Sequence, residues 1–518
     1  MEFTLEQKVG QMLMVGFEGL EPPVYVLDWL AAGRIGGVIL FGRNVDTPEQ
    51  VAALTQACHE AASSPILIAI DQEGGRVARL RAGFSESPGA MALGAADSDE
   101  LAERVSTALA LEMRALGINW TLAPVVDIAH NAENPVIGTR ALGSDPARVA
   151  ALAAAQIRGF QRGNIATSAK HFPGHGNTPV DTHVDMATVG GSLEFLWAHD
   201  LVPFRAAVAA GVDSVMISHV KLAALDAEHP STLSRVVVSG LLREQVGYDG
   251  LVCTDCMEMK ALGLYYGVGE RAVRAAQAGI DIIFFSHTRA YQEEAYVALL
   301  AAAQSGELPL AQIDAAVGRI SALKAQVAIT GEPQLQIIRD PDHLALMAEA
   351  ARAGTVLLRA DAAAYPLRPA AYGRSVLVEF PSYLDSEAME GGGLSNLAGL
   401  LRGRVPGIDC LTLDVQTPLA DAVSQVVAQA ADAEVVILAT RNAHLWPDEL
   451  EVARAIIGAA QDVILLCLSN PYDADLLPGA GTVICTCGDA APSLAAAVGA
   501  VLGDFTPSGR LPVALDKQ

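Results

Sequence analysis

Residues 1–340 alternate short apolar runs with longer segments of helical periodicity, and this alternation constrains the fold more than any other feature. Strands that alternate with helices over such a length form βαβ units and a parallel sheet. About eight strands in roughly 300 residues fit a (β/α)8 barrel of the TIM type better than an open sheet. An open doubly wound sheet usually shows a phosphate-binding glycine fingerprint after its first strand, and none appears here. We expect strands at 12–15, 37–41, 66–70, 119–122, 165–169, 214–217, 251–253 and 280–285.

The composition of the chain changes at residues 331–342, a polar stretch that contains two prolines. Six further strand-like runs, separated by helical segments, follow it and predict a second α/β layer domain, an αβα sandwich. We therefore expect a catalytic barrel over residues 1–340, a linker at about 331–350 and the sandwich over 350–518. The final stretch PSGRLPVAL (507–515) is expected to form a loop and a closing strand.

Five of the predicted barrel strands are followed directly by polar side chains. The ends of parallel barrel strands meet at one face, which carries the active site in TIM-barrel enzymes. A single strand followed by polar side chains would be weak evidence for a site, but five such strands predict a site at that face. The residues are Asp71, Glu73, Arg76 and Arg79, then Asp127 with a loop reaching Arg140, then Lys170 and His171, then Ser218 and His219, and finally Thr254 and Asp255.

The segment 170–185, KHFPGHGNTPVDTHVD, is the main active-site candidate. It leaves an apolar strand, is broken by prolines and glycines, and holds three of the eleven histidines of the chain. Loops at strand ends carry chemistry more often than packing. The alternatives are a metal site or a merely solvated loop. Lys170 and the lack of a regular ligand spacing or a partnering cysteine argue against a metal site. We expect neither a metal nor a cofactor.

The acidic and imidazole groups suit hydrolysis of a glycosidic bond, which in retaining enzymes needs a carboxylate nucleophile close to a proton donor. Asp255 ends an apolar strand and is the best nucleophile candidate. Glu258 is the fallback, but if residues 257–262 are helical, its side chain points away from the strand end. Asp181 can orient the imidazole of His183 as the proton donor. The alternative is that Asp181 and His183 are simply an exposed Asp-x-His pair in a loop, with no catalytic role.

Several charged groups are suited to binding sugar hydroxyls, because charged hydrogen bonds are the strong kind. For Arg79 and Arg140 the alternative is a structural pairing with barrel carboxylates such as Asp127. The expected sugar-binding residues are Asp71, Arg79, Arg140, Lys170, His171 and His219.

The stretches DQEGGRV (71–77), KHFPGHG (170–176), DTH (181–183), SH (218–219) and TD followed by MEMKAL (254–262) resemble glycoside hydrolase family 3. Within it they are most similar to the bacterial β-N-acetylhexosaminidases in their two-domain form. The resemblance implies a retaining mechanism with a glycosyl-enzyme intermediate on Asp255 and an acid/base dyad of Asp181 and His183. It also implies that the six sugar-binding residues hold the sugar in subsite −1. Thr182 stands where serine is common.

The resemblance further implies a small carbohydrate partner, a terminal non-reducing β-linked N-acetylglucosamine, as in cell-wall (muropeptide) fragments recycled in the cytoplasm. Three alternatives stay open. One is a phosphorylase, because a neutral histidine in place of a carboxylate acid lowers the repulsion toward an incoming phosphate anion. The second is a β-glucosidase or β-xylosidase, whose acid is a glutamate of the second domain; with the dyad present, that role is not assigned to Glu449. The third is a non-catalytic sugar-binding protein.

Composition limits the partners and the compartment. A formal net charge of −25 and a pI near 4.7 argue against nucleic acid. The seven cysteines are expected to be reduced, and a redox or metal role for Cys253-x-x-Cys256 is disfavoured. The N-terminus MEFTLEQKVG does not resemble a secretory signal, and no uncharged apolar run reaches the ~20 residues of a membrane helix. We therefore expect a cytoplasmic protein with no membrane partner and leave its oligomeric state open.

Overall fold

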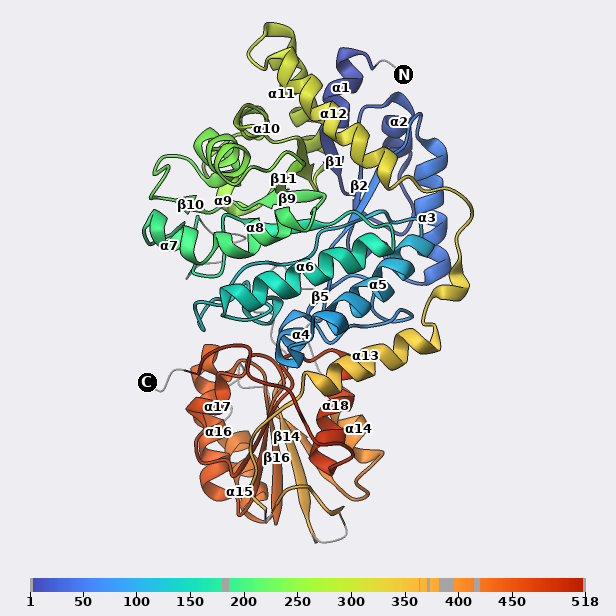
Figure 1. The fold of residues 1–518 in the computed structure, drawn as a ribbon. Coiled ribbons are helices and arrows are strands. Elements are labelled where there is room, and N and C mark those ends of the chain that lie inside the picture. Colours follow the sequence, from blue (N-terminus) through green and yellow to red (C-terminus); the bar gives the residue numbers. More distant parts are fainter. Residues whose placement is uncertain are drawn as a thin grey trace.

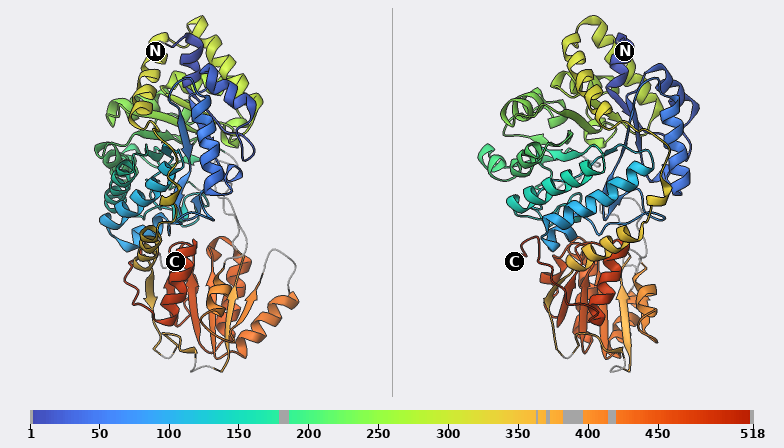
Figure 2. Two further views of the ribbon diagram at one scale, coloured as in Figure 1. Left: turned by 90° about the vertical axis from the view of Figure 1, so that its right-hand side faces the viewer. Right: turned by 45° about the vertical axis from the view of Figure 1, so that its right-hand side comes forward.

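The structure is a computed structural model that describes residues 3–178, 186–362, 364–369, 373–381, 396–413 and 420–515. The chain first forms a barrel domain, then crosses by one long helix to a smaller sheet domain below it (Figure 1). Two further views show the same stacking of the smaller domain against one side of the barrel (Figure 2). No helix of the described residues is long and apolar enough to cross a membrane.

Eight parallel strands form the barrel, and each one pairs with its neighbour in the chain. The ring closes between the fourth and fifth strands, where Trp120 and Ala166 form a parallel bridge and Thr121 N–H donates to Ala166 O at 2.9 Å. The predicted (β/α)8 barrel is thus confirmed. Its strands are β1 (Leu13–Val15), β2 (Gly37–Leu40), β3 (Leu67–Ile70), β6 (Trp120–Thr121), β7 (Ser168–Phe172), β9 (Ser214–Ile217), β11 (Leu251–Cys256) and β12 (Ile282–Phe285).

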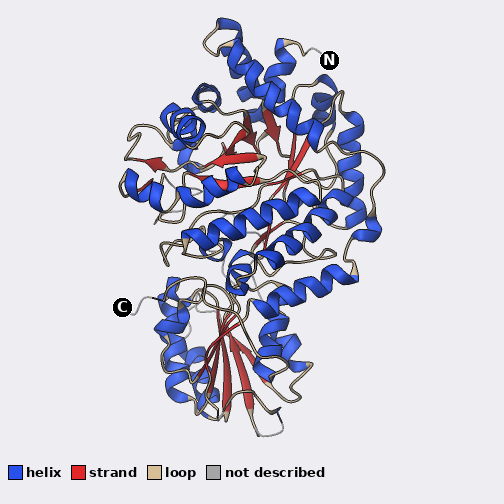
Figure 3. Ribbon diagram, in the orientation of Figure 1, coloured by secondary structure: helices blue, strands red, loops and turns tan. Residues whose placement is uncertain are grey.

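Helices surround the barrel strands on the outside (Figure 3). Several begin at side chains that satisfy their free backbone N–H groups: Thr47, Ser98 and Asp145 each accept from the first turn of the following helix. The barrel helices are α1 (Leu5–Gln11), α2 (Val24–Ala32), α3 (Pro48–Ala61), α4 (Ala90–Ala96), α5 (Asp99–Ala115), α6 (Pro146–Arg162), α7 (Leu193–Ala198), α8 (Leu201–Ala209), the π-helix η4 (Val236–Gln245), α9 (Lys260–Gly263), α10 (Val268–Ala278), α11 (Arg289–Ser305) and α12 (Leu310–Gln326).

Two strands end later than their apolar runs predict. β7 continues through Lys170 and His171, which we expected in the loop after it, and β11 continues to Cys256. The interior of the barrel is polar at its carboxyl face, so the last residues of these strands are polar. A prediction from apolar periodicity therefore ends each strand too early. The site residues of β7 and β11 are consequently held by the strands themselves.

The second domain is a six-stranded sheet in the order β13-β18-β17-β16-β14-β15, parallel except for β13. Helices α15 and α16 contribute to the apolar core on one face, and α14 and α18 to the core on the other. The predicted αβα sandwich is confirmed. Its elements are β13 (Val356–Arg359), β14 (Ser375–Glu379), α14 (Leu397–Arg402), β15 (Asp409–Thr412), α15 (Ala420–Ala431), β16 (Val435–Thr440), α16 (Pro447–Ala459), β17 (Val463–Cys467), α17 (Asp473–Leu476), β18 (Thr482–Cys485) and α18 (Ala491–Leu502).

Two segments join the domains. Helix α13 (Pro341–Ala353) contacts α4 and α5 of the barrel and α18 of the sandwich. The expected closing strand near the C-terminus is wrong, because residues 506–515 are irregular. Their hydrogen bonds go to both domains: Gly509 N–H donates to Thr355 O at 3.0 Å, and Arg510 N–H to Ala95 O at 2.8 Å. Prolines, which lack an N–H, interrupt any ladder there.

We predict that Gly37→Ala destabilises the barrel. A Cβ at Gly37 would lie 1.9 Å from the backbone oxygen of Leu67 on the neighbouring strand, so two barrel strands would have to separate. Overpacking of this kind costs about 1–3 kcal/mol or more. Gly318→Ala in α12 is the matched control: nothing lies within 4 Å of its added Cβ, and alanine favours helix by about 1 kcal/mol. Thermal midpoints that shift in the same direction for both variants would contradict the packing argument.

Candidate active site

A cavity of about 320 Å³ opens at the carboxyl ends of the barrel strands. Among the described residues, its lining comes entirely from the barrel and includes none from the second domain. Six of the residues predicted from the sequence meet there, although they come from segments far apart in the chain: Asp71, Arg79, Arg140, Lys170, His171 and Asp255.

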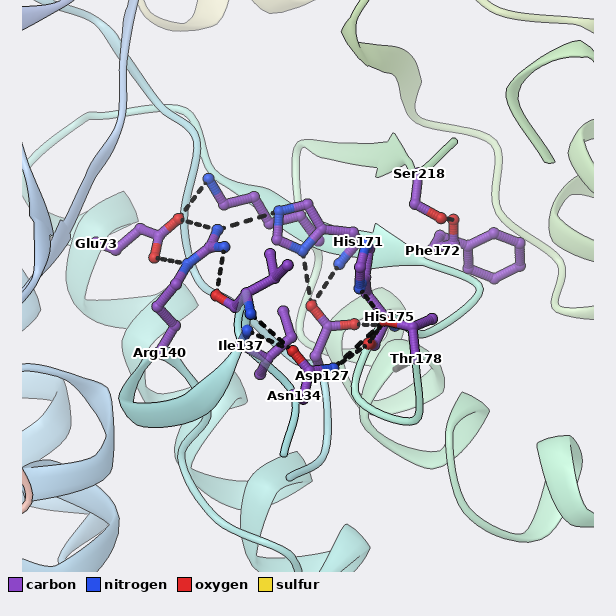
Figure 4. Close-up of polar contacts among 12 residues, drawn as sticks. Glu73, Asp127, Asn134, Ile137, Arg140, His171, Phe172, His175, Thr178 and Ser218 are labelled. Carbon is purple, nitrogen blue, oxygen red and sulfur yellow. Dashed lines mark hydrogen bonds and ion pairs between the residues drawn. The ribbon is translucent and has the colours of Figure 1, made fainter. Parts of the chain in front are cut away.

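A buried network of charges forms the floor of the cavity (Figure 4). Lys170 Nζ lies 2.7 Å from Asp71 Oδ1 and 2.6 Å from Glu73 Oε1. Arg140 holds the same Glu73 carboxylate with two hydrogen bonds, from Nε at 2.9 Å and from Nη2 at 2.8 Å. Arg79 Nη2 lies 3.6 Å from Asp71 Oδ2. The expected alternative for the arginines therefore holds in part: both are paired with carboxylates, and both also line the cavity.

The charges of this network stabilise one another. Burial by itself would raise the pKa of Glu73, but the charges of Arg140 and Lys170 outweigh it and hold that pKa well below its ordinary range. Burial would likewise lower the pKa of Lys170, but Asp71 and Glu73 outweigh it and raise the pKa. The lysine remains a cation and the glutamate an anion, so the floor offers fixed charged donors to a ligand.

Asp127 orients the imidazole of His171. Its Oδ2 accepts from His171 Nδ1 at 2.7 Å and from the backbone N–H of His171 at 3.0 Å, while Oδ1 accepts from His175 N–H at 2.6 Å. Burial would raise the pKa of Asp127, but His171 and the other donors outweigh it and lower the pKa. With Nδ1 carrying the proton, Nε2 of His171 can accept from Arg140 Nη2 at 3.2 Å. Arg140 is thus fixed from two sides, by Glu73 and by His171.

His175 also lines the cavity, although the sequence analysis assigned it no role. Its Nδ1 lies 2.8 Å from Thr178 Oγ1. Burial and the neighbouring His171 lower the pKa of His175 to about 4. A fixed, uncharged imidazole therefore stands beside the charged floor.

Asp255 lies near the end of β11, half-buried, and faces the cavity. The backbone N–H of Cys256 donates to Asp255 Oδ1 at 2.7 Å. Glu258, the fallback nucleophile, precedes α9, which begins only at Lys260, so no helix points it away and it also lines the cavity. Its carboxylate accepts from the backbone N–H groups of His287 at 2.7 Å and Thr288 at 3.1 Å. Glu258 thereby fastens the loop that follows β12.

His219 is the one predicted and described sugar-binding residue that does not line the cavity. It is fully buried, and its Nδ1 lies 2.7 Å from Thr232 Oγ1 while Nε2 lies 2.8 Å from Cys256 O. We expected it at the cavity because it follows β9 in the same register as the other site residues. The structure places it behind the end of β11, next to the residue that follows Asp255.

Asp181 and His183, the predicted acid/base pair, lie outside the described residues.

The cavity also includes residues that the sequence analysis did not select. Glu73 was recognised only as one of several groups after β3, and no sequence pattern indicated that Lys170 and Arg140 would share it. Phe41, Arg43 and His287, from the ends of β2 and β12, follow apolar runs but belong to no pattern of acids and histidines.

Comparison with known proteins identifies the family of the barrel domain. The family model for the glycosyl hydrolase family 3 N terminal domain matches residues 4–323. A beta-hexosaminidase from Stenotrophomonas maltophilia (strain K279a) is 39% identical over 314 residues, which are 60% of this chain and 91% of the relative. The barrel, with its cavity, is the part that the family model matches.

Solved structures extend the likeness to both domains. A glycoside hydrolase family 3 beta-N-acetylglucosaminidase from Paenibacillus sp. str. FPU-7 has a TM-score of 0.92 and 36% identity, with 100% of each chain covered. A beta-glucoside phosphorylase has a TM-score of 0.84 over 99% of this chain and 94% of its own, but at 23% identity this likeness concerns the fold alone.

A (β/α)8 barrel with charged groups at the carboxyl ends of its strands has the architecture of a TIM-barrel enzyme, and the family match identifies that enzyme as a glycoside hydrolase. The chain belongs to glycosyl hydrolase family 3. Its resemblance to the bacterial β-N-acetylhexosaminidases is confirmed by relatives described as a beta-hexosaminidase and as a beta-N-acetylglucosaminidase.

We predict that His175 makes the stability of the protein depend on pH between about 4 and 6.5. Its folded-state pKa of about 4 lies below the ordinary value of 6.5, so only the unfolded chain binds a proton in this window. Stability from this group is complete above pH ~6.5 and falls as the pH decreases, by about 1.4 kcal/mol per pH unit. Urea unfolding of wild type and His175→Gln at several pH values should give a shallower slope for the variant. Parallel slopes would contradict the prediction.

Proposed function

We propose that this protein removes terminal, non-reducing β-linked N-acetylglucosamine by a retaining mechanism. The observation that carries the proposal is the placement of Asp255 at the same cavity as the buried floor of Asp71, Glu73, Arg140 and Lys170. A pyranose needs several fixed donors and acceptors for its hydroxyl groups, and this floor supplies them in one rigid cluster. The names of its relatives supply the choice of an acetamido sugar.

The floor forms subsite −1 in this proposal. Asp71, Arg79, Arg140, Lys170 and His171 hold the ring hydroxyls and the acetamido group. His219, as a buried neighbour of the β11 end, supports Asp255 in place of the sugar contact that we first expected for it. Because the donors are already fixed by Glu73 and Asp127, little rearrangement is needed when the sugar binds.

Asp255 is the nucleophile of the proposed reaction. One carboxylate oxygen attacks the anomeric carbon as the bond to the leaving oxygen breaks, and a covalent glycosyl-Asp255 intermediate results. His183, oriented by Asp181, donates its proton to the leaving oxygen. In the second step the neutral imidazole takes a proton from water, whose oxygen attacks the anomeric carbon and releases Asp255. The sugar thereby keeps its β configuration.

The proposed biological setting is the recycling of cell-wall (peptidoglycan) fragments in the cytoplasm, with muropeptide fragments as substrates. Once its proton has passed to the leaving oxygen, the His183 imidazole is uncharged and would repel an incoming phosphate less than a carboxylate would, so a phosphorylase is the second candidate. A β-glucosidase is less favoured. Glu449, the second-domain glutamate considered for such an enzyme, is fully buried in α16 and does not line the cavity.

The substrate and the acceptor can be tested together. Release of 4-nitrophenol from its β-N-acetylglucosaminide and its β-glucoside should be fast for the acetamido sugar alone, with free N-acetylglucosamine as the product. Preference for the glucoside would contradict the substrate assignment. A rate that rises steeply with phosphate and yields sugar 1-phosphate would make the protein a phosphorylase. If wild type cleaves neither sugar, the protein is better described as a sugar-binding protein.

We predict that Asp255→Ala lowers kcat by at least about 10³-fold, because loss of a nucleophile removes the covalent route. Glu258→Gln is the matched control. It is the other carboxylate of the same strand end and rim, and its amide oxygen can still accept from the backbone N–H groups of His287 and Thr288. Intact-protein mass spectrometry with an activated 2-deoxy-2-fluoro glycoside should detect an adduct on wild type, on the peptide that contains Asp255. An adduct on Glu258 would reverse the assignment.

We predict that the loss caused by His183→Ala depends on the leaving group. A substrate whose leaving oxygen needs protonation should lose about 10²–10⁴-fold, the usual range for general acid catalysis. A 2,4-dinitrophenyl glycoside leaves readily without a proton, so its first step should lose much less. Asp181→Asn should show the same dependence more weakly. An equal loss for both leaving groups in His183→Ala would mean that this histidine is not the general acid.

A further inference from the structure

The loop that carries Arg140 to the cavity is embedded in the second domain. It follows β6 and runs from Ile128 to Ala141, and four of its apolar side chains belong to the core on one face of the second sheet. They share this core with side chains of β14, β16 and β17 rather than with the barrel core. The four residues are Ala129, Val136, Ile137 and Ala141.

A polar clamp holds the same loop from the carboxyl edge of the second sheet. Asp473, fully buried at the start of α17, accepts from His444 N–H at 3.0 Å and from His444 Nδ1 at 2.8 Å. The other ring nitrogen, Nε2, lies 3.1 Å from Ala132 O. A backbone carbonyl can only accept, so Nε2 carries a hydrogen and donates to Ala132. His444 is therefore a buried link from the second domain to the barrel loop.

The loop approaches the second domain closely at a second point. Gly138 has a left-handed backbone with φ +42°, and a Cβ on it would lie 3.0 Å from Asn470 Nδ2. Asn470 N–H and Nδ2 both donate to Asn442 Oδ1, at 3.1 and 2.9 Å. Gly138 begins the short 3-10 turn η2 (Gly138–Arg140), so this contact lies only two residues before Arg140.

Between these two points the loop is stiff. Asn134 Oδ1 accepts from the backbone N–H groups of Val136 and Ile137, both at 2.9 Å (Figure 4). The carbonyl of Val136 then accepts from Arg140 Nη1 at 3.1 Å. Ala132 is thus connected to the Arg140 guanidinium by a short series of hydrogen-bonded turns.

We propose that the second domain positions Arg140, with His444 as the positioning residue that fixes Ala132 and Asp473 as the group that orients His444. The inference rests on the proposed function, in which Arg140 holds the sugar in subsite −1. The second domain supplies none of the described cavity lining, yet it sets the direction of one of the donors in it. Its role is in sugar affinity, not in bond cleavage.

Two polar substitutions at His444 separate this role from general destabilisation. In His444→Gln, the amide nitrogen can take the place of Nε2 and donate to Ala132. In His444→Asn, the shorter amide takes the place of Nδ1, keeps the bond to Asp473 and loses the bond to Ala132. We expect His444→Asn to raise KM and the dissociation constant of N-acetylglucosamine about tenfold, with kcat changed less than about threefold. His444→Gln should stay within about twofold of wild type.

Arg404→Ala serves as the control, because it removes an exposed ion pair with Asp504 elsewhere in the second domain, and it should leave KM unchanged. Hydrogen exchange of residues 128–141, measured without ligand, should be faster in His444→Asn than in wild type or His444→Gln. Unchanged exchange and KM in His444→Asn would overturn the proposal, and so would equal losses in both His444 variants.

The exchange result does not depend on the substrate. If His444→Asn loosens the loop but Arg140→Lys binds N-acetylglucosamine as wild type does, the contact between the domains stands and the sugar-binding role of Arg140 fails. If Arg140→Lys loses the sugar and His444→Asn leaves the loop unchanged, the proposed function stands and the positioning role of His444 fails.

Discussion

The Glu73 carboxylate, shared by Lys170 and Arg140, is the interaction on which the proposed site depends. Moving two cations out of water is costly, and a buried ion pair seldom adds net stability over a well-packed apolar core. Here the cations lie at a cavity, where their remaining donors are available to a ligand. Removing the carboxylate would leave two buried cations close together, with Asp127 and Asp71 as the remaining compensating charges near Arg140. The charge of Glu73 therefore holds the two cations in place.

The same network connects parts of the chain that are far apart. Glu73 follows β3, Arg140 ends the loop after β6, and Lys170 lies in β7. The loop after β6 in turn packs into the core of the second domain. The two domains therefore share one structural unit, which explains how a domain outside the described cavity lining can matter to ligand binding.

Much of the architecture was predictable because strand and helix periodicities are local properties. The eight barrel strands and the layered second domain follow from apolar runs separated by helical segments, and the polar residues that follow them indicate the face of the site. Strand ends were less predictable. A local pattern assigns Lys170 and Asp255 to loops, but β7 and β11 continue through them. Asp71 and Glu73 compensate the charge of Lys170 inside the barrel, and the backbone N–H of Cys256 donates to Asp255.

The sequence by itself determined the fold class, the family and six of the charged or imidazole residues that meet at the cavity, because each of these depends on local patterns and short motifs. Tertiary structure alone decided how these residues pair. It joined Arg140 to Glu73 and His171 to Asp127, and it placed His219 behind the strand end that carries Asp255. It also decided the contact of His444 with Ala132, residues that lie in different domains. Such pairings depend on distances between segments remote in the chain, and no local pattern encodes those distances.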